Sequence, residues 1–403
     1  MIEIKNKNNC CGCFACSSVC PKQCIQMVED EEGFIYPEVN KDICVDCHLC
    51  EKVCPIINVE DDTPRTQRAF LLQHKDAQIL KESTSGGAFT AIATWVIKHG
   101  GVVFGAAYDK DFQVTHQYVE KVEDLRIFRN SKYVQSNVGN AYSAALDYLK
   151  GNRIVCFSGT PCQLEGLMRF IRKTYDNLIT VDVMCHAITS PKLFRSYVEM
   201  KKNELNVTPE NIVFRDKKPY GYQYSSMSIY SGGKQVYHEG VDNDVYLRSF
   251  FTNMNVRPSC YDCKFKKRYH LTDFTLWDCF MVYKFDKSLD NDKGVTRILA
   301  NTDKASRILD EIRDQAVIVE LNADEAVAGV KEMKSSVRLN ERRYALFKDI
   351  EDKKDGKRVW NKYYPTTIRT KFEKIMRLFF VKTGLYTRLK KFIKKHVKDI
   401  KRV

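Results

Sequence analysis

The sequence predicts a small cysteine-rich α+β module, then an α/β core with a mixed sheet, and then a helical basic tail. Three observations lead to this prediction. Ten of the 16 cysteines lie before residue 55. From residue 68 onward, strand patterns alternate with helix patterns, which is typical of α/β architecture. Residues 366–403 hold 13 Lys and Arg against two Asp and Glu, so +11 of the net charge of +14 lies there.

These features divide the chain into four parts. The module spans 1–60, the two halves of the core span 66–150 and 151–335, and the tail spans 336–403. The start of the chain is polar and lacks the apolar segment of a signal peptide. No apolar run reaches the roughly 18–20 residues that a membrane-spanning helix needs. The sequence therefore predicts a cytoplasmic protein.

The elements follow from local patterns. Within the module, apolar alternation on both sides of 31–33 predicts a hairpin. In the core we expect strands over 68–73, 102–109, 114–120, 153–159, 178–186 and 316–321. We expect helices over 83–101, 141–152, 160–173, 190–205 and 297–312. A Gly-Gly turn predicts a second hairpin over 224–237.

The cysteine spacing in the module is doubled. Dense cysteine in a reducing compartment indicates metal binding rather than disulfides. C-x2-C-x2-C-x3-C-P occurs over 10–21 and again over 44–55. This is the bacterial two-cluster ferredoxin pattern, in which the last cysteine of each run binds the other cluster. We predict one 4Fe-4S cluster on Cys10, Cys13, Cys16 and Cys54, and another on Cys44, Cys47, Cys50 and Cys20. Zinc is the alternative, which two complete copies disfavour.

Two cysteines of the same stretch fall outside this pattern. Cys11 breaks the loop spacing, and Cys24 lies beyond Pro21, where we expect a small buried apolar residue. Phe14 and His48 stand where glycine is more common between the second and third cysteines. We expect this difference to change the solvation and potential of the clusters, but not their ligation.

Four cysteines of the core form a candidate third site. Cys162 follows Pro161 in the first turn of a predicted helix, where the helix dipole stabilises a thiolate. Cys185 ends the next strand, and the carboxyl ends of neighbouring parallel strands open into one crevice. Cys260 and Cys263 have the spacing of half a metal site. Together they could hold a third cluster; zinc, or buried cysteines without metal, are the alternatives.

Two further segments suggest binding. Ser85, Gly86 and Gly87 form a donor-rich turn at a helix start, which is typical of anion sites but common elsewhere. Lys132 and Tyr133 could add a cation and an aromatic face for a nucleotide cofactor, or else form a solvated helix end.

The tail places apolar residues at helical spacing among many lysines, namely Leu385, Leu389, Phe392 and Ile393. Such a basic amphipathic helix indicates an anionic membrane surface or an acidic partner. A solvated helix is the alternative. No nucleic-acid-binding module is recognisable, so nucleic acid is disfavoured.

In this order, the motifs resemble the beta subunit family of coenzyme F420 (deazaflavin) hydrogenases and dehydrogenases over about residues 1–320. The resemblance rests on the two ferredoxin-type runs and on STSGGAF, NSKYVQS, SGTPCQLEGL, CHAITSP, RPSCYDCKFK and KGVT. It implies FAD on the α/β core, with electrons passing between clusters and a hydride acceptor. The implied flavin residues are Ser85, Gly86, Gly87, Lys132, Tyr133, Gln135, Ser158, Gly159, Thr160, Pro161 and Gln163. The implied flavin-proximal cluster binds Cys162, Cys185, Cys260 and Cys263.

One segment departs from the family. TDFTLWDCFM stands where members usually carry a sequence like ADITLGDFWG, so Trp277 replaces a glycine, and Cys279 and Phe280 replace a Phe-Trp pair. A tryptophan there would narrow the substrate side of the flavin. Two hypotheses follow. The chain is a flavoprotein oxidoreductase with a redox partner such as ferredoxin or a dehydrogenase subunit. Otherwise it is an electron-carrying adaptor for a partner at the inner face of the membrane, for example in surface-polysaccharide synthesis.

Overall fold

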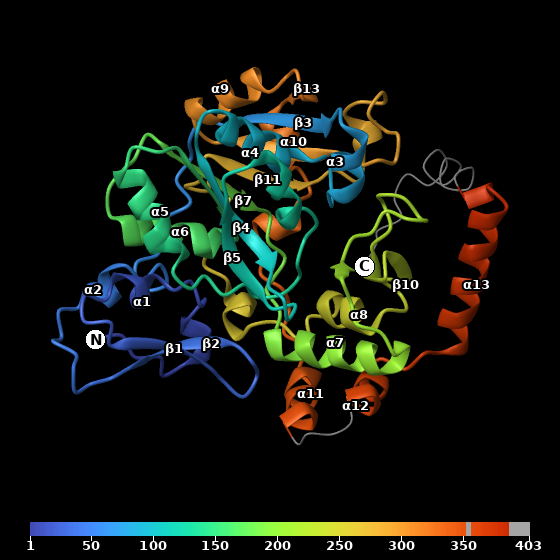
Figure 1. Ribbon diagram of the computed structural model, residues 1–403, viewed down its shortest axis with the longest axis horizontal. Coiled ribbons are helices and arrows are strands. Elements are labelled where there is room, and N and C mark those ends of the chain that lie inside the picture. Colours follow the sequence, from blue (N-terminus) through green and yellow to red (C-terminus); the bar gives the residue numbers. More distant parts are fainter. Residues whose placement is uncertain (352–355, 387–403) are drawn as a thin grey trace.

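A computed structural model describes residues 1–351 and 356–386. Its main body is an eight-stranded sheet with helices on both faces (Figure 1). The strand order is β13-β3-β12-β11-β7-β6-β4-β5. The strands are β3 (Arg68–His74), β4 (Val102–Tyr108), β5 (Val114–Val119), β6 (Val155–Gly159), β7 (Leu178–Val183), β11 (Phe274–Asp278), β12 (Thr296–Ala300) and β13 (Ala316–Leu321).

The sheet is mixed, as predicted. Strands β4, β6, β7 and β11 run parallel, and β3 shares their direction because β12 is antiparallel to both β11 and β3. Strands β5 and β13 are antiparallel at the two edges. Five carboxyl ends therefore lie along one border of the sheet, which we call the carboxyl edge. It consists of the ends of β3, β4, β6, β7 and β11.

Helices cover both faces of the sheet. On one face, α4 (Ala88–Lys98) and α9 (Asp303–Glu311) share a core with residues of β3, β12 and β11. On the other face, α5 (Ala141–Lys150) and α6 (Pro161–Ile171) pack over β4, β6 and β7. Short helices α3 (Ala77–Glu82) and α10 (Ala323–Val327) lie beside β3.

The N-terminal module lies against α5 and α6 (Figure 1). It contains a short 3-10 helix (Lys7–Asn9), α1 (Ala15–Val19) and α2 (Leu49–Lys52). The antiparallel pair β1 (Ile25–Glu29) and β2 (Ile35–Val39) confirms the predicted hairpin.

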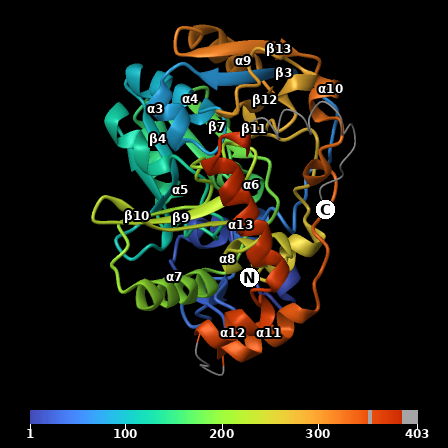
Figure 2. The ribbon, with the colours of Figure 1, turned by 90° about the vertical axis from the view of Figure 1, so that its right-hand side faces the viewer.

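A second core lies at the lower side of the molecule in Figure 1, around α7 (Pro191–Leu205) and α8 (Val245–Phe251). The sheet of β8 (Asn211–Val213), β9 (Ser226–Ser231) and β10 (Lys234–Gly240) belongs to it. So do α11 (Arg342–Glu351) and α12 (Gly356–Tyr363), where Trp360 is 1% exposed. The first helices of the predicted tail are thus integrated into this core. The last described helix, α13 (Ile368–Lys382), stands at the periphery (Figure 2).

The helix predicted over 297–312 is wrong in its first part. Residues Thr296–Ala300 form β12, because this apolar segment fills the place between β3 and β11. The helix begins after Thr302, whose side chain accepts a hydrogen bond from Ala305 N. The sequence patterns do not predict strands β8 and β11 or helices α3 and α8. Of the apolar tail residues, Leu389, Phe392 and Ile393 lie outside the described residues.

Candidate functional site

Four cysteines of the module gather where it meets the core. Cys10, Cys13, Cys16 and Cys54 lie close enough to influence one another. Burial raises the pKa of the Cys16 thiol, and its three partners raise it further. Burial likewise raises the pKa of Cys54 to about 11, with Cys13 and Cys10 adding to it. We call these four the inner quartet.

A second group lies farther from the core. Cys20, Cys44, Cys47 and Cys50 line one hollow, and we call them the outer quartet. Cys47 is exposed, whereas Cys50 is buried and its Sγ accepts a hydrogen bond of 3.3 Å from Ile2 N. A fifth thiol lines the same hollow, because Cys24 Sγ lies 3.3 Å from Cys20 Sγ. Cys24 is buried, as predicted, but it is not remote from the cysteine group.

The two cysteine motifs share one backbone conformation. Gly12 and Asp46 have φ angles of 69° and 50°, and Phe14 and His48 have φ angles of 70° and 58°. Phe14 and His48 are also the N-cap residues of α1 and α2. Left-handed backbone explains why glycine suits these positions, and each copy bears the strain of a bulky residue there. The duplication seen in the sequence is therefore a duplication of loop geometry.

The four core cysteines also come together. Cys162, Cys185, Cys260 and Cys263 line a second hollow at the carboxyl edge, and we call them the third quartet. Cys11 lines the same hollow. Cys162 lies in the first turn of α6 and Cys185 follows β7, so adjacent parallel strands bring them to one crevice as expected.

The start of α6 is fixed by its own side chains. Pro161 occupies the first helical position, and Thr160 and Gln163 form a capping box. Thr160 N donates to Gln163 Oε1 at 3.0 Å, and Thr160 Oγ1 lies 3.1 Å from Cys162 Sγ. These contacts hold the Cys162 thiol beside the hollow.

The inner quartet touches the helix that carries the third quartet. A Cβ atom on Gly166 of α6 would lie 2.9 Å from Cys13 Cβ and 3.0 Å from Cys13 Sγ. The Cys11 thiol bridges the two groups, since hydrogen bonds with Cys13 and Cys162 raise its pKa. The same contacts with Cys11 lower the pKa of Cys13 and of Cys162. Cys11 therefore lies between two groups of candidate ligands.

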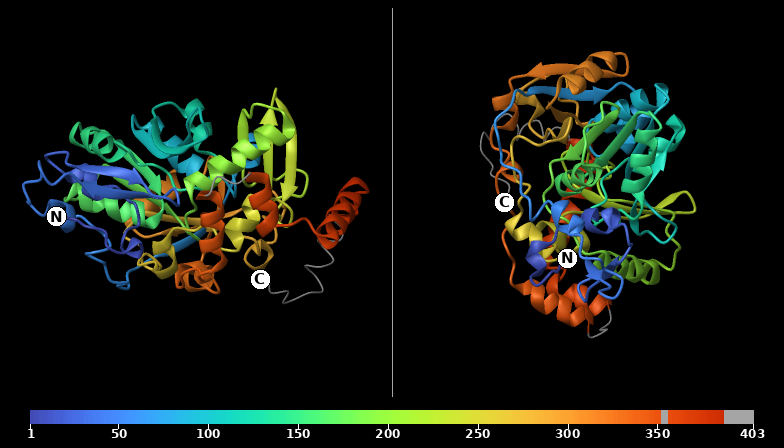
Figure 3. Two further views of the ribbon diagram at one scale, coloured as in Figure 1. Left: turned by 90° about the horizontal axis from the view of Figure 1, so that it is seen from below. Right: turned by 90° about the vertical axis from the view of Figure 1, so that its left-hand side faces the viewer.

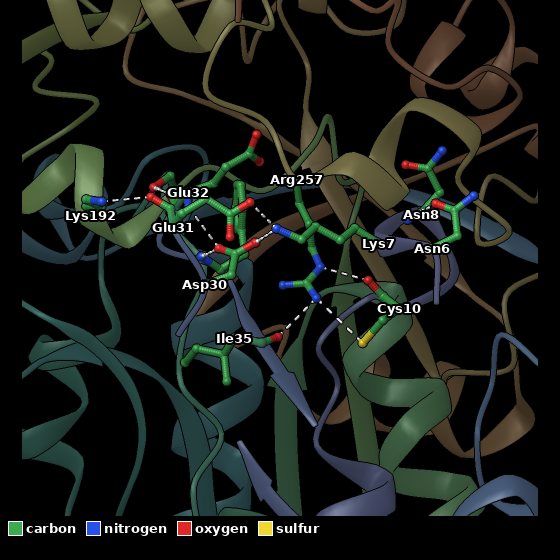
Figure 4. Close-up of polar contacts among 12 residues, drawn as sticks. Asn6, Lys7, Asn8, Cys10, Asp30, Glu31, Glu32, Ile35, Lys192 and Arg257 are labelled. Carbon is green, nitrogen blue, oxygen red and sulfur yellow. Dashed lines mark hydrogen bonds and ion pairs between the residues drawn. The ribbon is translucent and has the colours of Figure 1, made fainter. Parts of the chain in front are cut away.

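The side chain of Arg257 connects the module to the core through hydrogen bonds (Figure 4). Its buried guanidinium donates from Nε to Cys10 O at 2.8 Å and from Nη2 to Ile35 O at 3.0 Å. Nη1 donates to Gln135 Oε1 at 3.0 Å. The carbonyl of Arg257 accepts from Cys260 N at 2.9 Å. One residue thus links the inner quartet, the third quartet and a residue of the predicted flavin set.

Buried charges lie behind the third quartet. Lys267 Nζ contacts Glu165 Oε1 at 2.9 Å, and burial raises the pKa of Glu165 against the effect of Lys267. His270 Nδ1 lies 2.7 Å from Asp182 Oδ2, and although burial opposes it, this carboxylate raises the pKa of His270. These four residues and Arg257 are not predicted from the sequence. The basic run KFKKRYH after Cys263 was the available signal for Lys267 and His270.

The predicted flavin residues fall into two groups. Ser158, Gly159, Thr160, Pro161, Gln163 and Gln135 lie beside the third quartet. Ser85, Gly86 and Gly87 lie at the start of α4, against β12. Gly86 N donates to Thr296 Oγ1 at 2.8 Å, and a Cβ on Gly86 would lie 2.1 Å from Leu72 O. This glycine is required for packing between α4 and the sheet.

A hydrogen-bonded chain leads from the second group to Tyr133, another predicted flavin residue. Ser85 Oγ lies 3.4 Å from Tyr222 OH, which donates to Asp278 Oδ1 at 3.1 Å. Arg215 Nη1 contacts Asp278 Oδ2 at 3.0 Å and donates to Tyr133 OH at 3.2 Å. Arg215 is buried, and its Nη2 has no hydrogen-bond partner among the described residues. We call these five residues the Arg215 network. It offers one unsatisfied buried donor to an acceptor group.

Two predicted features behave differently from expectation. Lys132 Nζ donates to Ile127 O at 2.7 Å and Arg129 O at 3.1 Å, so backbone carbonyls already occupy it. Burial lowers the pKa of Lys132 to about 7. Trp277 packs with Met184 under Arg297, on the opposite face of β11 from Asp278. It does not narrow the space beside the Arg215 network.

Comparisons with known proteins agree with the motifs. Residues 152–326 match the family model that describes the C terminus of the coenzyme F420 hydrogenase/dehydrogenase beta subunit. Residues 9–57 match the model of a 4Fe-4S dicluster domain. A chain from the xenon-derivatised F420-reducing NiFe hydrogenase complex of Methanosarcina barkeri aligns with a TM-score of 0.43 at 16% identity. That alignment covers 73% of this chain and 90% of the other. No curated protein matches the chain.

Proposed function

From the premise that this chain carries the C-terminal domain of coenzyme F420 hydrogenase/dehydrogenase beta subunits behind a 4Fe-4S dicluster domain, we propose a three-cluster flavoprotein. The two domains support an iron–sulfur, oxidoreductase-type electron-transfer role. The finer proposal is that three 4Fe-4S clusters and FAD link an external redox partner to a hydride acceptor.

The observation that supports this proposal most is the grouping of the cysteines. Twelve cysteines form three sets of four, and each set supplies the thiolates that one cubane cluster takes. The outer and third quartets line hollows.

The positions of the quartets give the sites an order. Iron–sulfur clusters supply one-electron transfer, and FAD would exchange hydride. The outer quartet includes the exposed Cys47, the inner quartet contacts α6 at Gly166, and the third lies at the carboxyl edge. A donor such as ferredoxin or a dehydrogenase subunit therefore has its closest approach at the outer quartet.

The FAD part of the proposal rests on unsatisfied donors. Arg215 Nη2 and Gln135 Nε2 are buried without hydrogen-bond partners among the described residues. Buried donors in native proteins are paired, so the unpaired donor of Arg215 beside Tyr133 and that of Gln135 beside Arg257 support an acceptor group at each of these two places. Arg215, Tyr133 and Ser85 would hold FAD at the first place, and Asp278 keeps the guanidinium in position.

One observation favours the adaptor instead. Phe280 stacks on Tyr222 with ring centroids 5.2 Å apart, and the Arg215 guanidinium lies 5.4 Å from the Phe280 centroid. The chain's own ring thus occupies an aromatic face next to the network. If that arrangement persists, the protein carries electrons on its clusters to a partner enzyme and has no flavin chemistry of its own.

Anaerobic purification with iron, sulfide and flavin quantitation tests the proposal. We expect about 12 irons and one FAD per chain, and about eight irons after Cys162→Ser or Cys263→Ser. Cys156→Ala, a buried cysteine outside the quartets, is the matched control and should retain about 12. Arg215→Met should lose FAD and keep iron. A protein that holds clusters but no flavin, even after FAD is supplied, would contradict the flavoprotein proposal and favour the adaptor. Eight irons in the unaltered protein would exclude the third cluster.

A further inference from the structure

Helix α13 is attached to the body through charged side chains. Lys374 forms an ion pair with Glu239 at the end of β10. Arg377 Nη2 donates to Asp242 Oδ2 at 3.0 Å, and its guanidinium lies 3.7 Å from the Tyr224 ring centroid. None of the residues of α13 is buried. The polar side of this helix therefore faces the protein.

The opposite side of α13 is an exposed apolar stripe. Ile368, Phe372, Ile375 and Phe379 are 88%, 61%, 63% and 53% exposed. Their spacing of four, three and four residues aligns them on one face, because each helical residue turns by about 100°. By the same geometry, Lys374 and Arg377 lie on the other side. Amphipathic helices of globular proteins normally turn such a stripe toward the core, and α13 does the reverse.

Basic residues border this stripe. Arg369, Lys371 and Lys382 lie on its two flanks by helical geometry. Residues 383–403 add eight Lys and Arg against one Asp. Figure 3 places α13 at one end of the molecule, with the N-terminal module at the other. An apolar stripe between cations matches a surface with negative headgroups above an apolar interior.

We propose that α13 binds an anionic membrane surface, with the stripe among the acyl chains and the flanking cations at the headgroups. No helix among the described residues is long and apolar enough to cross a bilayer. The exposed apolar stripe along one face of α13 would place the helix in the plane of the interface. A second copy of the chain is disfavoured as occupant, because it would bring two strongly basic segments together. This orientation leaves the outer quartet at the far end from the membrane.

Vesicle flotation of the full-length, anaerobically purified protein tests this proposal. The vesicles are pure phosphatidylcholine, or phosphatidylcholine with a quarter phosphatidylglycerol. We expect binding to the anionic vesicles and little to the neutral ones. The double variant Phe372→Asp with Phe379→Asp should bind at least about tenfold more weakly, because it removes the apolar anchor.

The matched control is Leu339→Asp with Val317→Asp. These residues are 46% and 41% exposed and lie outside α13, so this variant has the same charge change without touching the stripe. It should bind like the unaltered protein. If both double variants lost vesicle binding equally, the effect would be explained by the change in net charge, and this result would overturn the proposal. So would equal binding to neutral vesicles, no binding to anionic ones, or a dimer that the Phe372 and Phe379 changes dissociate. Iron content of each variant reports that the body is folded, and none of these outcomes depends on FAD.

Discussion

The module and the core assemble their cysteine groups in different ways. In the module, two short motifs with the same left-handed turns present three thiols each, and only Cys20 and Cys54 cross over. In the core, the third quartet collects Cys162, Cys185 and the Cys260–Cys263 pair from three distant segments, through strand order. A locally built site depends on loop geometry, whereas a site built by the sheet depends on the whole fold. The contacts between the two regions are therefore the points at which the protein is most sensitive.

The largest effect on stability is expected at Arg257, which connects the module to the core. Arg257→Met would remove a buried guanidinium and leave the partly buried carbonyls of Cys10 and Ile35 without donors, at a cost of about 3–5 kcal/mol in the free energy of unfolding. Arg195, which pairs with Glu29 and also bridges the regions, has a side chain that is 37% exposed. Arg195→Met should cost less than about 1 kcal/mol. Anaerobic urea unfolding measures the free energy of unfolding of both variants. An equal decrease in the two would show that Arg257 is not the main connection between the module and the core.

A smaller effect is expected at the contact between α6 and the inner quartet. Gly166→Ala would place a methyl group 2.9 Å from Cys13 Cβ, so the module must shift, at about 1–3 kcal/mol. Gly151→Ala at the end of α5 meets backbone atoms only at 3.5 Å and should be tolerated. Thermal unfolding and iron content compare the two variants. A Gly166→Ala protein as stable as the control would mean that the contact is loose.

Acid should weaken the core through its buried histidines. Burial lowers the pKa of His116 to about 4, although its hydrogen bond with Ser158 O opposes this. The folded protein holds this ring neutral, so its contribution is lost as pH falls from about 6.5 toward 4, by at most about 1.4 kcal/mol per pH unit.

Urea unfolding of the wild type and His116→Phe between pH 7.5 and 5.5 measures this slope. The variant should have a shallower slope but not a flat one, because burial also lowers the pKa of His74, His186 and His238. Identical slopes would show that His116 is accessible to protons in the folded state.

The smallest effect is expected at Cys11, whose thiol lies between the module and the core, and it concerns the reduction potential of one cluster. Cys11→Ala should keep about 12 irons and lower one cluster potential, because a hydrogen bond to a ligand sulfur is lost. A hydrogen bond of about 1 kcal/mol corresponds to about 40 mV for one electron. Cys11→Ser, which retains a donor, is the control in an EPR-monitored redox titration. Loss of four irons in Cys11→Ala would make Cys11 a ligand instead.

The same contrast explains what the sequence could predict. The quartets of the module follow from spacing alone, and the strand end at Gly159 follows from regular alternation. The next strand is predicted over 178–186 but ends at Val183. The sequence of β12 predicts a helix. The segment forms a strand because it pairs with β3 and β11 on either side, which the local sequence pattern does not reveal. Arg257, Asp182 and Glu165 could not be predicted, since their partners lie about 90 or more residues away. The Arg215 network likewise exists only after the sheet has formed.

Under the proposed function, Gly166 affects the rate of electron transfer as well as the stability of the protein. A glycine inside a helix costs about 1 kcal/mol relative to alanine. In return, α6 approaches the loop of Cys13 without an intervening methyl group. Electron tunnelling slows steeply with separation, so with the proposed clusters on the inner and third quartets the missing side chain would shorten the path between them. In that case α6 would give up some helix stability in exchange for a shorter tunnelling distance.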